Sequence, residues 1–167
     1  DLYNIAMDSV KLNQEGVAPI KAELAAIDAL KDKGEIYAYI AESQKKGIRP
    51  YFTMFVSADD MNSSMNIVQT YQGGIGMGQR DYYLENDEQT KNIRNKYQEH
   101  IAKMFQLAGY DEATAQKAVK AVMNIETRLA QSARSQVELR DPHANYNKMD
   151  METLKKNFPT FNWDAYF

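Results

Sequence analysis

Four of the chain's eight glycines fall within six residues, from Gly73 to Gly78, and an Arg-Asp-Tyr-Tyr run follows at once. A glycine-rich loop between a strand and a helix could cradle a phosphate with its backbone N–H groups. The Walker pattern, however, requires Lys-Ser or Lys-Thr after its last glycine, and Gln79-Arg80 stands there. The dinucleotide pattern requires a further glycine where Gln79 or Asp81 stands. The stretch therefore predicts a turn with an unusual backbone path, clamped by Arg80, Asp81, Tyr82 and Tyr83.

The two histidines, His100 and His143, are the only candidates for a histidine-based zinc site. Neither belongs to a His-Glu-x-x-His motif, and the inverted motif would require a histidine where Lys96 stands. The chain also has no cysteine and no Gly-x-Ser-x-Gly nucleophile elbow. The sequence therefore predicts no catalytic residue and no metal ligand in this chain.

A calcium loop is the remaining candidate site. Oxygen-bearing side chains alternate as calcium ligands do, at Asp60, Asn62, Ser64 and Asn66. Met65 occupies the position of the required glycine, and Tyr71 that of the bidentate acid. A solvated connection is therefore the favoured interpretation, and a calcium-stabilised domain stays open as an alternative.

Composition limits the function classes. A chain of 167 residues is most simply one domain, and its 44% hydrophobic and 26% charged residues are ordinary for a globular protein. A net charge of −3 argues against a nucleic-acid partner, which requires clustered Lys and Arg. No apolar run approaches the length of a membrane span, and the first residues do not resemble a signal peptide.

The first third of the chain predicts helices. Apolar side chains recur at helical spacing over residues 2–14, again from Pro19 to Gly34, and in a shorter helix that reaches Lys46. Residues 51–56 and 66–71 then predict two strands, joined by a polar connection over residues 57–65. We expect an antiparallel hairpin that lies on the helices, because a lone hairpin is marginally stable in water.

The rest of the chain predicts a long antiparallel helix pair. The first helix is expected to be capped by Asn86 and to end at Gly109, and the second to run from a cap at Asp111 to about Gln136. An irregular piece follows from Asp141. Asp150 and Asn162 are expected to cap two short final helices, the second cut off at Phe167. The expected fold is mainly α (α+β), one partial domain over residues 1–167, and both ends suggest a piece of a larger protein.

Three blocks of residues resemble the neprilysin and endothelin-converting-enzyme family of zinc metalloendopeptidases. Residues 76–83 are similar to the family's Gly-Leu-Pro-x-Arg-Asp-Tyr-Tyr signature, with Met77 and Gly78 in place of Leu and Pro. Residues 55–63 are similar to its Phe-Val-x-x-Asp-Asp-x-Asn-Ser segment. The third block resembles Arg-x-Asp-Pro followed by Tyr-Asn-Lys-Met; its matching residues are Asp141, Pro142, Tyr146, Asn147, Lys148 and Met149.

This resemblance implies a two-domain peptidase in which a helical domain caps a zinc domain and limits entry to small peptides. The family's zinc and substrate motifs belong to a C-terminal part, so no catalytic residue carries over, and zinc is expected in that part and not in this chain. The implied partners are the catalytic zinc domain of the same parent chain and peptide substrates. The absence of cysteine fits a bacterial member, and an extracytoplasmic location is expected. The alternative is a free-standing helical module that binds a protein partner.

Overall fold

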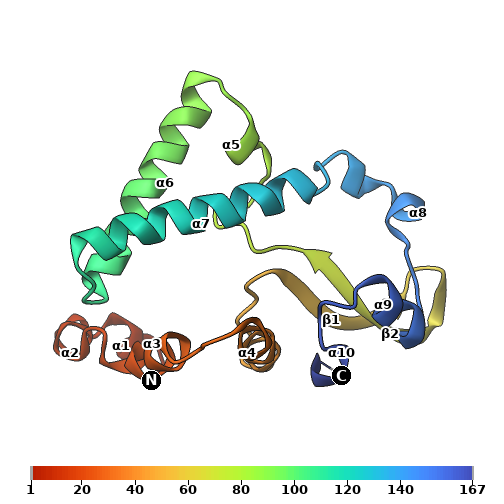
Figure 1. Cartoon of the computed structure of the whole chain (residues 1–167), viewed down its shortest axis with the longest axis horizontal. Helices are drawn as coiled ribbons and strands as arrows, with labels where there is room; N and C mark the ends of the chain where they lie inside the picture. The colour runs from red at the N-terminus through yellow and green to blue at the C-terminus, as the bar shows by residue number, and fades with distance from the viewer. Residues whose placement is uncertain (1, 167) are drawn as a thin grey trace.

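The computed structural model describes residues 2–166 and places a row of short helices opposite a long helix pair (Figure 1). The row comprises α1 (Leu2–Met7), α2 (Ser9–Glu15), the 3-10 turn η1 (Ala18–Ile20), α3 (Lys21–Asp28) and α4 (Lys33–Lys45). The expected helix over residues 2–14 is wrong in one respect. It is interrupted at Asp8, whose carboxylate accepts a hydrogen bond from the Lys11 N–H and so begins a second helix there.

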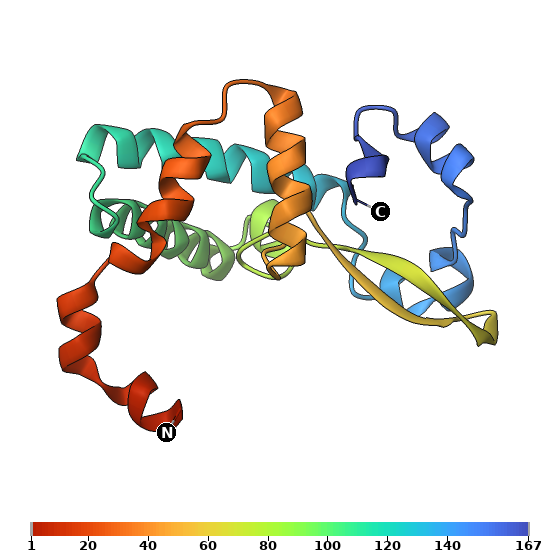
Figure 2. The same cartoon turned by 90° about the horizontal axis from the view of Figure 1, so that it is seen from below.

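A two-stranded antiparallel sheet follows, formed by β1 (Phe52–Asp59) and β2 (Asn62–Gln72). The expected hairpin is confirmed, but the polar connection over residues 57–65 is wrong, because only Asp60 and Met61 lie outside the strands. A register irregularity lies between Ala58 and Asp59, next to the turn. Phe52 and Met54 of β1 pack against α4 and α10 (Trp163–Tyr166), and the hairpin turn points away from the helix pair (Figure 2).

The long helix pair consists of α6 (Glu88–Leu107) and α7 (Glu112–Ser132), preceded by one helical turn, α5 (Asp81–Leu84). Asp111 caps α7 by accepting the Thr114 N–H, as expected. The cap of α6 is Asp87 and not Asn86, since the Asp87 carboxylate accepts the Thr90 N–H. Helix α7 ends earlier than expected, at Ser132, and α5 was not predicted.

The part of the chain after α7 leads along the hairpin and back to α4 (Figure 1). Its elements are the 3-10 turn η2 (Glu138–Arg140), α8 (Pro142–Asn145), α9 (Met151–Asn157) and α10 (Trp163–Tyr166). Asp150 caps α9 as expected. Together these elements confirm a mainly helical fold with one small hairpin.

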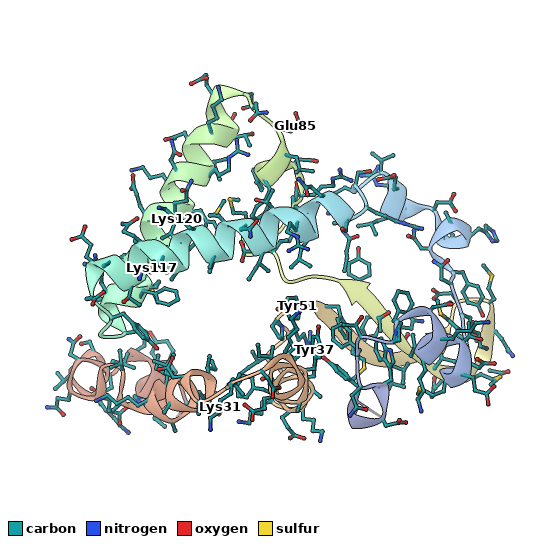
Figure 3. All side chains as sticks on the ribbon, viewed as in Figure 1. Lys31, Tyr37, Tyr51, Glu85, Lys117 and Lys120 are labelled. Atoms are coloured by element: carbon teal, nitrogen blue, oxygen red, sulfur yellow. The ribbon has the colours of Figure 1, made fainter. Side chains whose placement is uncertain are left out.

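Buried side chains of the described residues form two separate groups. In the first, Ile40 and Ala41 of α4 pack against Trp163 and Tyr166 of α10, with Phe52 of β1 beside them. The second lies between α5, α6 and α7 and contains Tyr83, Ile101, Ala115, Val119 and Ala130. The row of short helices meets the helix pair through one described hydrogen bond, from the Tyr110 hydroxyl to the Asp28 carboxylate. Figure 3 labels Lys117 and Lys120 on α7, with Lys31 between α3 and α4.

Candidate functional site

The glycine stretch connects β2 to α5, and two of its glycines are required by close contacts. Gly74 has φ +74°, and a Cβ there would lie 2.4 Å from the Pro50 carbonyl oxygen. A Cβ at Gly76 would lie 2.0 Å from the Tyr97 hydroxyl oxygen. The glycines therefore let the chain pass against β1 and against α6, which is a packing role and not a phosphate cradle.

Two of the four residues that follow the glycines fasten this turn. The Arg80 guanidinium donates to the Ala133 carbonyl at the end of α7, at 2.6 Å. The Tyr83 hydroxyl accepts from the Met77 N–H at 3.0 Å and donates to the Glu126 carboxylate at 2.6 Å. Asp81 and Tyr82 make no side-chain hydrogen bond to another described residue, so the predicted clamp rests on Arg80 and Tyr83.

Glu126 of α7 is the centre of this network. One carboxylate oxygen accepts from Tyr83, and the other accepts from the Tyr97 hydroxyl of α6 at 3.1 Å. Burial, followed by the nearby Glu126 charge, raises the pKa of Tyr97 to about 12. Burial and the bond to Glu126 also raise the pKa of Tyr83 above its ordinary value. Both tyrosines therefore stay protonated near neutral pH and act as hydrogen-bond donors.

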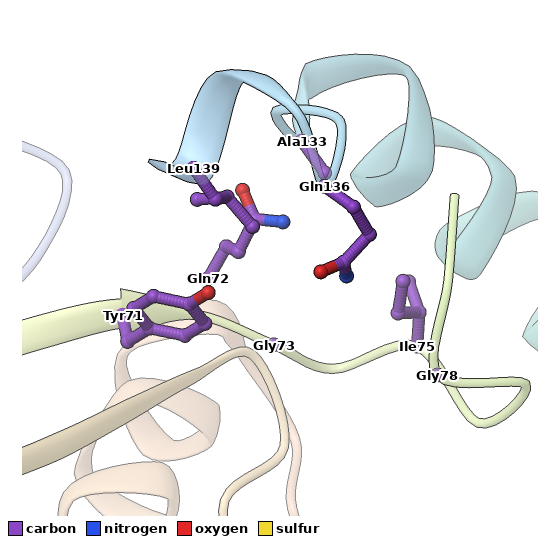
Figure 4. Close-up of a pocket in the computed structure, with 8 residues that line it drawn as sticks. All are labelled: Tyr71, Gln72, Gly73, Ile75, Gly78, Ala133, Gln136 and Leu139. Carbon is purple, nitrogen blue, oxygen red and sulfur yellow. The ribbon is translucent and has the colours of Figure 1, made fainter. Parts of the chain in front are cut away.

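A small cavity of about 130 Å³ lies beside this turn (Figure 4). Tyr71, Gly73 and Ile75 line one side of it, and Ala133 and Leu139 line the other. Its walls offer no charged group and no nucleophile beyond a tyrosine hydroxyl. The cavity therefore has no catalytic chemistry of its own.

A second polar cluster joins the other two resembling blocks. The Asp59 carboxylate, 1% exposed, accepts from the Met61 N–H at 2.9 Å, from the Tyr146 hydroxyl at 2.9 Å and from the Lys148 ammonium at 2.7 Å. The bond from Lys148, then that from Met61, lowers the pKa of Asp59 to about 2. We name Asp59, Tyr146 and Lys148 the hairpin latch, because they tie the hairpin turn to the segment before α9.

The remaining residues of the third block order their own segment. Asp141 caps α8 by accepting the N–H groups of His143 and Ala144, both at 3.0 Å, and Pro142 is the first residue of that helix. The Asn147 amide donates to the Asn145 carbonyl at 3.1 Å. Met149 is exposed, with its sulfur 4.0 Å from the Asn157 amide nitrogen. That these residues are signature positions of the family with a structural role stays a prediction.

Sequence reasoning missed the residues that receive these hydrogen bonds. Glu126 and Tyr97 fall within the predicted helix pair without a mark of their own, and Asp59 falls within a resembling block. Gln72 lies just beyond the predicted strand, and its side-chain amide pairs with the Arg134 backbone in both directions, at 2.8 and 3.0 Å. No spacing signal marks these partners, since each lies 29 or more residues from its counterpart.

The proposed ligand sets do not come together. His100 lies exposed on α6 and His143 exposed on α8. Within residues 2–166, no group of three His, Cys, Asp or Glu side chains could hold a metal ion. The calcium candidates Asn62, Ser64 and Asn66 lie within β2 and not in a loop, and the Asn62 side chain bonds to Ser64. No helix of the described part is long and apolar enough to cross a membrane.

The glycine-turn clamp and the hairpin latch are both built from residues of the resembling blocks. Residues 1–167 match the family model described as peptidase family M13. The chain therefore belongs to peptidase family M13, and the resemblance to neprilysin and endothelin-converting enzymes is confirmed.

Particular relatives cover much more sequence than this chain. It is 34% identical over 116 residues to an endothelin-converting enzyme homolog of Locusta migratoria, covering 70% of this chain and 16% of that protein. Human endothelin-converting enzyme 1 is also 34% identical over 116 residues, which are 68% of this chain and 15% of the enzyme.

Solved structures agree with the family assignment. The zinc metalloprotease ZMP1 of Mycobacterium tuberculosis, in complex with inhibitor, superposes with a TM-score of 0.87 at 30% identity, over 96% of this chain and 24% of that one. PEPO from Lactobacillus rhamnosis shares the fold, with a TM-score of 0.76 at 16% identity, over 88% of this chain and 23% of that one. The chain thus spans less than a quarter of the length of these proteins.

Proposed function

We propose that this chain is the N-terminal helical part of a zinc metalloendopeptidase that cleaves small peptides. The match of residues 1–167 to peptidase family M13 is the observation that carries the proposal. The solved relative titled a zinc metalloprotease supports the same chemistry for the parent protein.

The residues of this chain do not fit the zinc. The part of the chain that the structure describes holds no triad of metal-ligating side chains, and its two histidines are exposed on different helices. A catalytic zinc requires three converging protein ligands. We therefore assign zinc and catalysis to another domain of the parent, and no reaction step to this chain.

The surface of the chain supports its packing against a further domain. A compact monomer of 19.1 kDa exposes about 8,400 Å², whereas this chain exposes 12136 Å². Large apolar side chains contribute to the difference, including Leu2 at 84% and Ile5 at 62% exposed. An open apolar groove of about 460 Å³, lined by Ile27, Ile36 and Ile48 among others, lies between α3 and α4. We propose that the chain packs on the catalytic zinc domain, walls the substrate cavity and limits substrate size.

The test uses the full-length gene product and this chain side by side. The full-length protein is expected to bind one zinc ion, to cleave short peptides and to leave folded proteins of the same composition uncut. This chain alone is expected to bind no zinc and to cleave neither substrate. A full-length product without zinc-dependent cleavage overturns the enzyme proposal. Equal cleavage of peptides and folded proteins overturns the size filter alone.

We also propose that the parent acts outside the cytoplasm. The resemblance to a family with exported bacterial members supports this location. Cell fractionation with an antibody against this chain tests it, and recovery in the cytoplasmic fraction alone contradicts it.

A further inference from the structure

The hairpin carries almost no charge. Between Tyr51 and Gln79 the only charged side chains are Asp59 and Asp60, next to the turn, and Asp59 is taken by the hairpin latch. Strands at the edge of a sheet are normally protected from pairing by Lys, Pro, bulges or inward charges. The eleven residues of β2 contain no Lys, Arg, Asp, Glu or Pro. The register irregularity near Asp59 interrupts only the end of the hairpin at the turn.

The outer edge of β2 is also open in its hydrogen bonding. In an antiparallel pair, alternate residues of each strand point their N–H and C=O groups away from the partner. Among residues 2–166, no residue outside the hairpin donates to or accepts from the backbone of β2. The outer edge of β1 differs, because the Gln44 amide of α4 donates to the Phe52 carbonyl at 2.8 Å.

The side chains beside this edge are suited to strand pairing. Val68 is 43% exposed and Tyr71 is 48% exposed, and both residue types favour sheets. Ala133 and Leu139 lie beside the end of β2, across the cavity from Tyr71 (Figure 4). From Ser64 to Thr70, none of the described residues outside the hairpin makes a hydrogen bond to the backbone of β2, and Ser64, Met65, Asn66, Val68 and Thr70 are exposed.

We propose that the outer edge of β2, from Ser64 to Thr70, pairs with a third strand supplied by another segment of the same polypeptide. The inference rests on the proposed function, because it requires a parent larger than this chain. The segment is expected to be extended, uncharged and rich in β-branched or aromatic residues. An unprotected edge suits a strand that is always present, whereas a transient partner would leave it exposed to aggregation.

The amount of exposed surface favours this occupant over a short peptide. The chain exposes about 3,700 Å² more than a compact monomer of its mass. This excess is spread over the whole chain, and the chain covers only 24% of its solved relative ZMP1, so the parent has further segments that can cover the open edge. One added strand would satisfy the open edge.

Residue-resolved hydrogen exchange on this chain and on the full-length gene product tests the proposal. In this chain alone, alternate amides from Ser64 to Thr70 should exchange at nearly the unprotected rate, and the intervening amides should be protected by the ladder with β1. In the full-length protein, both sets should be protected, with the outward amides slowed about 100-fold or more. The intervening amides are the internal control for an intact hairpin.

A pair of proline variants identifies the edge independently. Val68→Pro and Gln69→Pro remove neighbouring N–H groups, of which one points toward β1 and the other outward. In this chain alone, one of the two variants should keep the inward amides of the hairpin protected from exchange. That variant has lost only an N–H group that points away from β1. In the full-length protein that same variant should abolish the added protection at the remaining outward amides.

Three results would overturn the proposal. The first is free exchange of the outward amides in both proteins. The second is protection in this chain that rises with its concentration, which identifies a second copy as the partner. The third is protection in the full-length protein only when a peptide substrate is added. If the full-length product shows no zinc-dependent cleavage, the proposed function is refuted. The hydrogen-exchange result still decides whether a third strand pairs with β2.

Discussion

Replacing Tyr83 by Phe removes one hydroxyl from the centre of the glycine-turn clamp and keeps its ring. The hydroxyl donates to the Glu126 carboxylate at 2.6 Å and accepts from the Met77 N–H at 3.0 Å. A bond to a charged group contributes about 1.5–3 kcal/mol and a neutral one about 0.5–1.5 kcal/mol. Because Tyr83 is 4% exposed, water cannot replace the lost partner freely. Glu126 keeps its bond from Tyr97, so we expect a loss of about 2–3 kcal/mol.

Thermal denaturation monitored by circular dichroism measures this loss. For a chain of 167 residues, 1 kcal/mol corresponds to about 2–4 °C, so the Tm of Tyr83→Phe should fall by about 4–12 °C. Tyr82→Phe is the matched control, since the neighbouring hydroxyl makes no hydrogen bond to a described residue. Its Tm should stay within about 1 °C of the wild type. If Tyr83→Phe and Tyr82→Phe have the same Tm, the hydroxyl of Tyr83 does not stabilise the turn and the clamp is refuted.

Three further predictions follow from the same structure. The pKa of Asp59 is about 2 against an ordinary 3.8, so its contribution to the stability of the fold is present above about pH 4 and is lost as the pH falls toward 2. Asp59→Asn should therefore lower Tm at pH 7 and make Tm less dependent on pH in the acid range. Gly74→Ala and Gly78→Ala both place a side chain at positive φ, which costs about 1–2 kcal/mol. Of the two, only the Cβ at Gly74 would meet backbone atoms. Chemical denaturation should therefore show a larger loss of unfolding free energy for Gly74→Ala than for Gly78→Ala. The pKa of Tyr97 is raised to about 12, so its contribution to the stability of the fold is complete below about pH 10 and is lost between pH 10 and 12. Tyr97→Phe should therefore make Tm less dependent on pH in this alkaline range. An unchanged dependence of Tm on pH would contradict the bond to Glu126.

Local patterns were sufficient for most of the fold. The helix pair could be predicted because apolar residues recur at helical spacing and Gly109, with φ +99°, permits the turn between α6 and α7. The cap of α6 was misplaced by one residue, since Asn86 and Asp87 are both good capping residues and adjacent in the sequence. The strands were predicted too short because Ser and Asn around Met65 have low strand propensity, which pairing across the hairpin overrides.

The candidate sites were harder to predict than the elements that hold them. Arg80 and Tyr83 were selected for their position after the glycines, but nothing in the sequence distinguishes them from Asp81 and Tyr82. The difference depends on which way each side chain leaves α5 relative to α7, and one helical turn sets that direction. The hairpin latch joins Asp59 to a residue 87 positions later, a pairing that no local period can encode.

Polar residues of the resembling blocks join segments that lie far apart in the sequence. Arg80 reaches the end of α7, and Tyr146 and Lys148 reach the hairpin turn. Apolar packing accepts many side chains of similar volume, whereas a hydrogen bond across two segments requires particular atoms at particular positions. Such directional contacts, each worth about 1 kcal/mol net, add to the apolar packing of α10 on α4 and fix how the hairpin turn and the segment after α7 are joined. A short polar motif therefore identifies this fold more specifically than its helices do, because it specifies how the segments are joined.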